Sequence, residues 1–182
     1  MVGAGIPKSR AAALVHLPRW AVAGFGIGMI ATHNLFDPIT PEQLGAWGGL
    51  WKVLHVQAPL EPVTGVTLFV AYPLIPWIGV MAAGYAFGGL LQGDTARRRR
   101  RLLILGLAMT LGVVVLRAIN VYGDPRPWSS QKNALFTFFS FINCSKYPPS
   151  LDYLLMTLGP AIAAMGIFDR PLGAVGRVFV VF

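Results

Sequence analysis

Apolar residues form four long runs in this chain, separated by shorter stretches rich in proline, glycine, aromatic and charged residues. A helix that crosses a membrane needs about 20 mostly apolar residues. By this criterion the pattern predicts spans at about 20–36, 66–91, 102–121 and 151–168. The sequence therefore predicts an all-α fold, a polytopic transmembrane helix bundle that forms one domain over residues 1–182.

The second apolar run, 65–91, is longer than one straight crossing requires. Its 27 residues would make a helix of about 40 Å, since each residue adds about 1.5 Å. Pro73 and Pro76 in "AYPLIPW" leave two possibilities open. Either the helix is kinked, or it begins near Leu74 after a lead-in along the membrane interface.

Composition supports the membrane class and excludes several others. The chain is 55% hydrophobic and 12% charged, with a mean hydropathy of +0.61, whereas a soluble domain carries about 25% charged residues. Its single cysteine, Cys144, excludes an intrachain disulfide and a zinc site built from cysteines. The net charge of +8 would suggest nucleic acid in a soluble protein. Here five arginines form one block at 97–101 between apolar runs, which is typical of a topology signal, so we expect no nucleic-acid partner.

The distribution of Lys and Arg over the loops predicts the orientation. With the N-terminus in the cytoplasm, ten of these residues lie inside and five outside, which is the favoured bias. We therefore expect a cytoplasmic N-terminus, with outer interfacial segments at 42–55 and 129–147. The ten inner residues are Lys8, Arg10, Arg19, Arg97, Arg98, Arg99, Arg100, Arg101, Arg170 and Arg177, and the five outer ones are Lys52, Arg117, Arg126, Lys132 and Lys146.

Glycines four residues apart occur in two of the predicted spans, as Gly24 with Gly28 and Gly84 with Gly88. This spacing lets two helix backbones approach closely within lipid. Two interpretations stay open: specific helix pairing through these glycines, or a composition that is simply rich in glycine.

Polar side chains collect at the predicted outer ends of the spans. Arg117 and Asn120 share one helical face near the end of the third span. An arginine deep in hydrocarbon costs at least ~2.5–3.5 kcal/mol, so Arg117 must face protein, water or a counter-ion. Its predicted partners are Asp37, Asp124 and Asp152; the alternative is an arginine that extends to the interface without chemistry.

The chemistry available to this outer polar group is limited. His33 is the predicted general base, and Asp37, one turn further on, could orient it to deprotonate an amine or hydroxyl. His55 is expected to be a surface group on an interfacial helix. Arg117 and Lys146 could hold an anionic substrate or a cofactor phosphate. The predicted binding residues are Asn34, Arg117, Asn120, Asp124, Asn143 and Lys146, and no metal site is predicted.

Five stretches of the sequence, covering about 14–182, resemble one family. They are "HNLFD", "LWKVLH", "YPLIPWIGVMAAGYAFG", "LRAINVYGDPRPW" and "SFINCSKYPPSLDYLLMTLGP". Together they resemble a bacterial family of membrane proteins grouped with heparan-alpha-glucosaminide N-acetyltransferase. The resemblance implies an acyltransferase in the bacterial cytoplasmic (inner) membrane, with acetyl-CoA as acyl donor and the amine or hydroxyl of a sugar as acceptor.

The same resemblance implies that the chain is a fragment of a larger bundle. Members of the family are roughly twice as long, and the catalytic histidine proposed for the acetyltransferase lies in an N-terminal half without counterpart here. No catalytic histidine is carried over, because His33 belongs to a different motif. The chain is expected to need the missing N- and C-terminal helices, or an oligomer, as partners within the lipid bilayer.

Two other functions stay open at this point. A transporter or permease-like module would use kinked helices and polar groups near the membrane midplane. The polar residues here lie at one membrane face, however, and the two halves of the sequence show no inverted repeat. The other possibility is an accessory structural subunit without catalysis.

Overall fold

The structure, a computed structural model, describes residues 17–169 and is mostly helical. This predominance of helix confirms the predicted all-α class. The α-helices are α1 (Arg19–Thr32), α2 (Gly48–Leu54), α3 (Leu74–Phe87), α4 (Thr95–Ile119), α5 (Ala134–Ile142) and α6 (Leu151–Phe168). The 3-10 helices are η2 (His33–Phe36), η3 (Pro41–Trp47) and η4 (Gly88–Leu91), and the strands are β1 (Ala58–Val63) and β2 (Val66–Val70).

Three helical segments within the described residues are long and apolar enough to cross a membrane. They are Leu74–Leu91, Thr95–Ile119 and Leu151–Phe168. Large apolar side chains on α4 point outward, with Leu107 60% and Leu111 63% exposed, as expected for a helix surrounded by lipid. The chain is therefore an integral membrane protein. The further span expected at 20–36 corresponds to α1, which has 14 residues, and η2, and it stays a prediction.

The second predicted span is wrong over its first residues, because 66–70 forms a strand instead of helix. β1 and β2 pair antiparallel around Gly65, whose φ is 84°. The sequence "VTLFV" is rich in β-branched and aromatic residues, which favour strands. α3 then begins at Leu74, which agrees with the second of the two possibilities, a helix that starts near this residue instead of a kinked one. Pro76 lies in its first turn, where a missing amide hydrogen leaves no helical hydrogen bond unmade.

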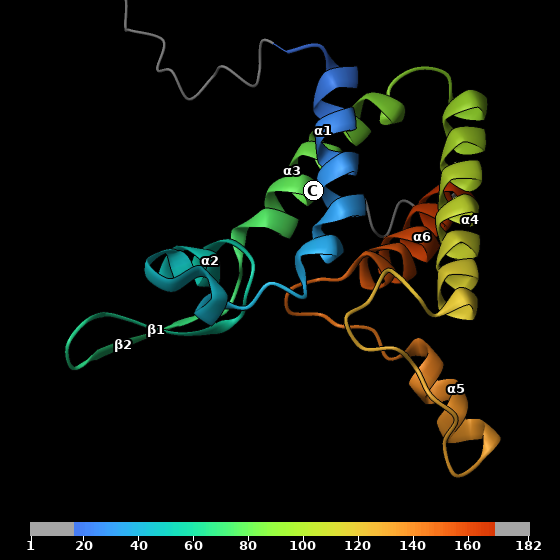
Figure 1. The fold of residues 1–182 in the computed structure, drawn as a ribbon. Coiled ribbons are helices and arrows are strands. Elements are labelled where there is room, and N and C mark those ends of the chain that lie inside the picture. Colours follow the sequence, from blue (N-terminus) through green and yellow to red (C-terminus); the bar gives the residue numbers. More distant parts are fainter. Residues whose placement is uncertain (1–16, 170–182) are drawn as a thin grey trace, which may run out of the picture.

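The helices pack as two antiparallel pairs, α1 with α3 and α4 with α6 (Figure 1). In the first pair, a Cβ added at Gly26 would lie 2.5 Å from the Ala83 backbone nitrogen and 2.8 Å from the Gly79 carbonyl oxygen. In the second, a Cβ at Gly106 would lie 2.7 Å from the carbonyl oxygen of Gly159. Only glycine permits these approaches, so these positions set how closely each pair packs.

Of the two interpretations left open for these glycines, the described residues show no helix pairing through Gly24 and Gly28. A Cβ added at either position would have no atom within 4 Å, and the same holds for Gly84 and Gly88. Gly26 lies two residues from both Gly24 and Gly28, which places it about 200° around the helix from them. The face that contacts α3 is therefore the one opposite Gly24 and Gly28.

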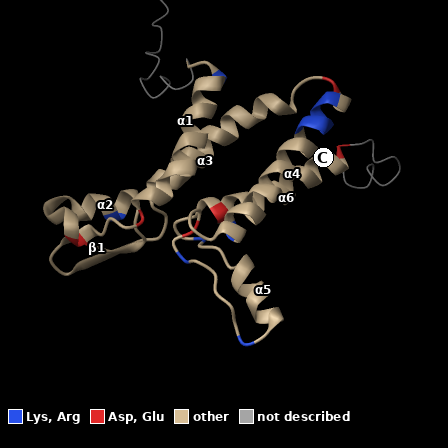
Figure 2. Cartoon of the chain, turned by 45° about the vertical axis from the view of Figure 1, so that its right-hand side comes forward, with Lys and Arg blue, Asp and Glu red and all other residues tan. Residues whose placement is uncertain are grey.

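The arginine block at 97–101 belongs to the first turns of α4 rather than to a loop before it. Asp94 caps this helix end by accepting a hydrogen bond from the Arg97 amide (3.1 Å). The Arg98 guanidinium binds both carboxylate oxygens of Asp169 at 2.6 and 2.7 Å, which ties the start of α4 to the end of α6. Figure 2 shows this block at the end of α4 opposite the loop that follows the helix.

At the other end, the loops join the two helix pairs by hydrogen bonds. The Tyr122 hydroxyl donates to the carbonyl of Ala31 (2.5 Å), which links the segment after α4 to the end of α1. The amide of Leu151, the first residue of α6, donates to the Asn34 side chain (2.9 Å). The residues predicted to carry chemistry lie in and around these loops.

Candidate functional site

The first group of candidate side chains is formed by His33, Asn34, Asp37 and His55, here named the His–Asp cluster. His33 and Asn34 begin η2, which continues α1, and Asp37 follows η2 directly. His55 follows the last residue of α2, a helix that folds back against η2. His33 is fully buried, and His55 is 2% exposed.

Hydrogen bonds fix the orientation of Asp37 within this cluster. Its Oδ1 lies 3.0 Å from Nε2 of His55, and its Oδ2 accepts from Nδ2 of Asn34 at 2.8 Å. The other end of the Asn34 amide accepts from the Leu151 amide. Asp37 is therefore positioned from both sides, and through Asn34 it is connected to the start of α6.

His33 contributes an imidazole whose two nitrogens have no hydrogen-bond partner within residues 17–169. Its ring lies edge-on to that of His55, with centroids 6.1 Å apart, and Nδ1 of His55 is unpartnered too. One nitrogen from each histidine and one oxygen of Asp37 lie within 4.8 Å of one another. The cluster thus joins one bonded imidazole–carboxylate pair to one free imidazole.

Two predictions about these histidines are wrong. Asp37 was expected to orient His33, but it binds His55 instead. In the 3-10 helix η2, residues three apart lie on one face, so Asn34 rather than His33 is the neighbour of Asp37. His55 was expected at the surface, but it is buried beside the tilted ring of Trp51, with ring centroids 5.0 Å apart, and edge-on to Phe36.

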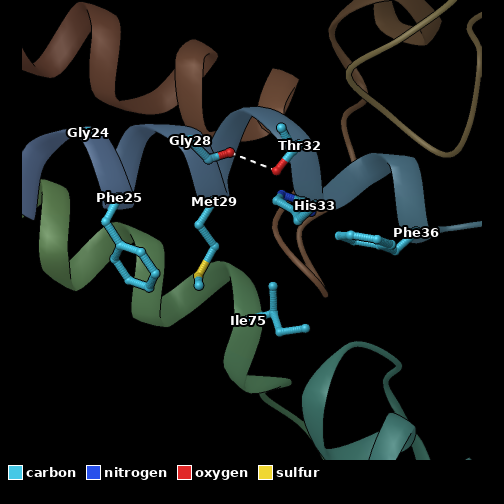
Figure 3. Close-up of a pocket in the computed structure, with 8 residues that line it drawn as sticks. All are labelled: Gly24, Phe25, Gly28, Met29, Thr32, His33, Phe36 and Ile75. Atoms are coloured by element: carbon cyan, nitrogen blue, oxygen red, sulfur yellow. Dashed lines mark hydrogen bonds between the residues drawn. The ribbon is translucent and has the colours of Figure 1, made fainter.

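His33 also lines a groove of about 420 Å³ along α1 and η2, with Ile75 of α3 at its edge (Figure 3). The lining is apolar except for Thr32 and His33, and the Thr32 hydroxyl donates to the carbonyl of Gly28 (2.8 Å). His33 is thus the polar group of the groove whose side chain is left without a partner. The lining residues are Gly24, Phe25, Gly28, Met29, Thr32, His33, Phe36 and Ile75.

The second group surrounds Arg117, which is 2% exposed. Its guanidinium donates to the carbonyls of Phe141 (2.7 Å) and Ser140 (2.9 Å), the last turn of α5. It lies 3.8 Å from Asp152, which is therefore the partner among the three predicted aspartates. Arg117 was predicted to bind a substrate, but its donors are used to cap α5.

Asn120 and Asp124 are also occupied by the protein itself. The Asn120 side chain accepts from the Trp128 amide (3.1 Å) and donates to the Trp128 carbonyl (3.0 Å). Asp124 accepts from the hydroxyls of Ser145 (2.8 Å) and Ser150 (2.7 Å). These two predicted binding residues hold the loop between α4 and α6 in shape.

Asn143 and Lys146 are exposed, and Asn143 contacts the second group through its carbonyl, which accepts from Arg117 (3.4 Å). The Lys146 ammonium lies 5.0 Å from the centre of the Tyr147 ring, and this neighbour raises the pKa of Lys146. Within the described residues, no hydrogen bond or ion pair joins either side chain to the His–Asp cluster. Both stay available to an anionic ligand.

Comparison of the chain with protein-family models, with curated proteins and with solved structures finds no match. The function of the site therefore has to follow from its own residues. A carboxylate that binds an imidazole fixes the ring's orientation and stabilises its charged form. With a second imidazole beside it, the His–Asp cluster has the groups needed to accept a proton or to bind a cation.

Proposed function

We propose that the chain is part of a membrane-embedded acyltransferase, with acetyl-CoA as acyl donor and a sugar amine or hydroxyl as acceptor. One observation carries the proposal: buried His55 is hydrogen-bonded to half-buried Asp37, next to the unpartnered His33 that lines a groove. The resemblance to the family of heparan-alpha-glucosaminide N-acetyltransferase supports the same reaction class.

The cluster would deprotonate the acceptor during the transfer. As the acceptor nitrogen or oxygen forms a bond to the acetyl carbonyl carbon, the bond from that carbon to sulfur breaks and the coenzyme A thiolate leaves. The acceptor's proton passes to the cluster and from there to water, and the thiolate takes up a proton from water on the side where acetyl-CoA binds. General base catalysis of this kind contributes about 10²–10⁴-fold to a rate.

Each polar residue then has a distinct part in the proposal. Asp37 orients and stabilises the imidazole of His55, and Asn34 positions Asp37. Arg117 keeps α5 and its loop in place. Lys146 is exposed in the loop before α6, at the same end of the helices as the His–Asp cluster, and is the proposed contact for an anionic part of a substrate.

The proposed orientation puts the His–Asp cluster on the outer side of a bacterial cytoplasmic membrane, where the acceptor binds. Its support is the arginine block of α4, which lies at the opposite end of that helix from the loops (Figure 2). Because Lys and Arg favour the cytoplasmic side, the block would be cytoplasmic and the loops external.

Acetyl transfer in native membranes tests the proposal. Membranes that contain the wild-type protein are incubated with radiolabelled acetyl-CoA and glucosamine, and the labelled product is identified by mass spectrometry. We expect labelled product that depends on the protein and falls about 10²–10⁴-fold when both His33 and His55 are replaced by alanine. Transfer at the wild-type rate in that double variant would overturn the role of the cluster.

A further inference from the structure

We infer that His33, His55 and Asp37 together bind a divalent transition metal ion, with Zn²⁺ as the best match. Two imidazole nitrogens and one carboxylate oxygen are a ligand set found in catalytic zinc sites. The sequence does not predict this site, because the spacing of the three residues matches no metal-binding motif. The inference needs only the geometry of these side chains and does not depend on acyl transfer.

The distances are close to those that a tetrahedral ion requires. Bonds of about 2.0–2.1 Å put the ligand atoms of a tetrahedral zinc about 3.3 Å apart. Oδ1 of Asp37 and Nε2 of His55 are already 3.0 Å apart, and all three donor atoms lie within 4.8 Å of one another. The His33 ring would have to move closer to Asp37 and His55 to complete the set.

The burial of the two histidines points in the same direction. Buried polar groups in folded proteins nearly always have a partner. Here both ring nitrogens of His33 and Nδ1 of His55 are buried without one, in the part of the chain that the structure describes. An ion pair between charged His55 and Asp37 would account for Nε2 of His55 alone, whereas a metal ion would also give one nitrogen of His33 a partner.

A hydrogen bond to a neighbouring residue holds Asp37, as is usual for a metal-binding carboxylate, whereas both imidazoles lack such a bond to a residue outside the three ligands within residues 17–169. Asn34 binds Oδ2 of Asp37, which leaves Oδ1 directed at His55. The ring of Trp51 lies tilted against His55, and its indole nitrogen donates to the carbonyl of Ile39 (2.8 Å). Two of the three ligands are therefore oriented before an ion arrives.

A consequence for the reaction rests on the proposed function. Three protein ligands leave a fourth position for the acceptor's oxygen or nitrogen, whose lone pair would bind the ion. A bound zinc makes such a group far more acidic, and its proton would leave to water. The imidazoles would then act as ligands, and deprotonation of the acceptor would depend on the ion.

Metal titration of the purified protein tests the inference. The full chain is purified in detergent through a tag without histidines, treated with a chelator and titrated with Co²⁺, whose visible spectrum reports tetrahedral coordination. We expect one Co²⁺ per chain, displaced by Zn²⁺. Wild-type protein that binds no stoichiometric ion would overturn the inference and would leave a water molecule as the partner of His33.

Variants locate the ion. We expect His33→Ala, His55→Ala and Asp37→Asn each to weaken Co²⁺ binding by at least 100-fold, and Asn34→Ala by about 10–100-fold. The matched controls are His16→Ala, a histidine outside the described residues, and Glu61→Gln, an exposed carboxylate. Unchanged Co²⁺ binding in both His33→Ala and His55→Ala would overturn the site.

The same preparation separates this inference from the proposed function. Stoichiometric metal without acetyl transfer would support the site and count against the acyltransferase. Acetyl transfer at full rate in protein shown to be free of metal would support the acyltransferase and overturn the metal's part in it.

Discussion

The Asp37 carboxylate and the His55 imidazole are hydrogen-bonded at 3.0 Å across a separation of eighteen residues. The contact exists because α2 folds back on η2, so that the end of one element meets the end of the other. It converts a histidine that the sequence places at the surface into a buried one. The relationship makes the His–Asp cluster a single unit built from two parts of the chain.

Replacing Arg117 with glutamine is expected to destabilise the protein strongly. The change leaves Asp152 without its charge partner and the last carbonyls of α5 without their donor. Breaking a buried pair from one side costs about 3–5 kcal/mol. Unfolding in detergent measures this cost, and a double variant, Arg117→Gln with Asp152→Asn, should recover part of the loss. Wild-type stability of Arg117→Gln would contradict the assigned role.

The close contact of α1 with α3 predicts different effects for two neighbouring glycines. Gly26→Ala puts a methyl group 2.5 Å from the Ala83 nitrogen and should cost about 1–3 kcal/mol. Gly28→Ala meets no atom within 4 Å and should be neutral or slightly stabilising, because alanine favours helix by about 1 kcal/mol. Thermal unfolding of both variants checks this. The reverse order would mean that the face around Gly28 is the packed one.

Cys144 is expected to react slowly with alkylating reagents near neutral pH. Burial raises the pKa of its thiol to about 11. The charge of Arg117 lowers this pKa, whereas the charges of Asp124 and Asp152 raise it. Only the thiolate reacts, so the rate at pH 7.5 should be roughly 100-fold below that of an exposed cysteine. The rate of labelling by iodoacetamide as a function of pH measures it, with an exposed Lys132→Cys as the reference. Equal rates would contradict the burial.

Acid should break the ion pair of Arg98 and Asp169, which joins the start of α4 to the end of α6. The Arg98 guanidinium holds the pKa of Asp169 below its usual range. At a pH near that pKa, the Asp169 carboxylate therefore binds fewer protons in the folded protein than in the unfolded chain. The stabilisation is therefore complete above the ordinary aspartate pKa, about 4, and is lost as the pH falls below it. Unfolding from pH 7 to pH 2 in the wild type and in Asp169→Asn measures the effect. An equally steep loss in both would contradict it.

The apolar helices were predictable because their signal is local. The fourth span, expected at 151–168, coincides with α6, whose start is fixed by Ser150, a residue that caps the helix by accepting from the Tyr153 amide (3.1 Å). The start of α3 after Pro73 follows from the same kind of signal. Each helix is defined by its own run of residues, and no distant contact is needed to predict it.

The His–Asp cluster was predictable only in part, because distant contacts build it. The residues near His33 could be singled out as polar groups at the end of a span. The burial of His55 depends on the fold of α2, which Trp51 fixes through the carbonyl of Ile39. Likewise, the sequence shows which glycines are four apart but not that Gly26 is the one that faces α3.

One measurement tests the central claim, that Asp37 and His55 act with His33 as one catalytic unit. Acetyl transfer from acetyl-CoA to glucosamine is compared in membranes carrying the single variants His33→Ala, His55→Ala and Asp37→Asn and the triple variant, with His16→Ala as control. Residues that act as a unit give strongly non-additive losses. We predict that His33→Ala and His55→Ala each lose nearly as much activity as the triple variant, about 10²–10⁴-fold, while the control keeps the wild-type rate. Wild-type rates in His33→Ala and His55→Ala would contradict the account.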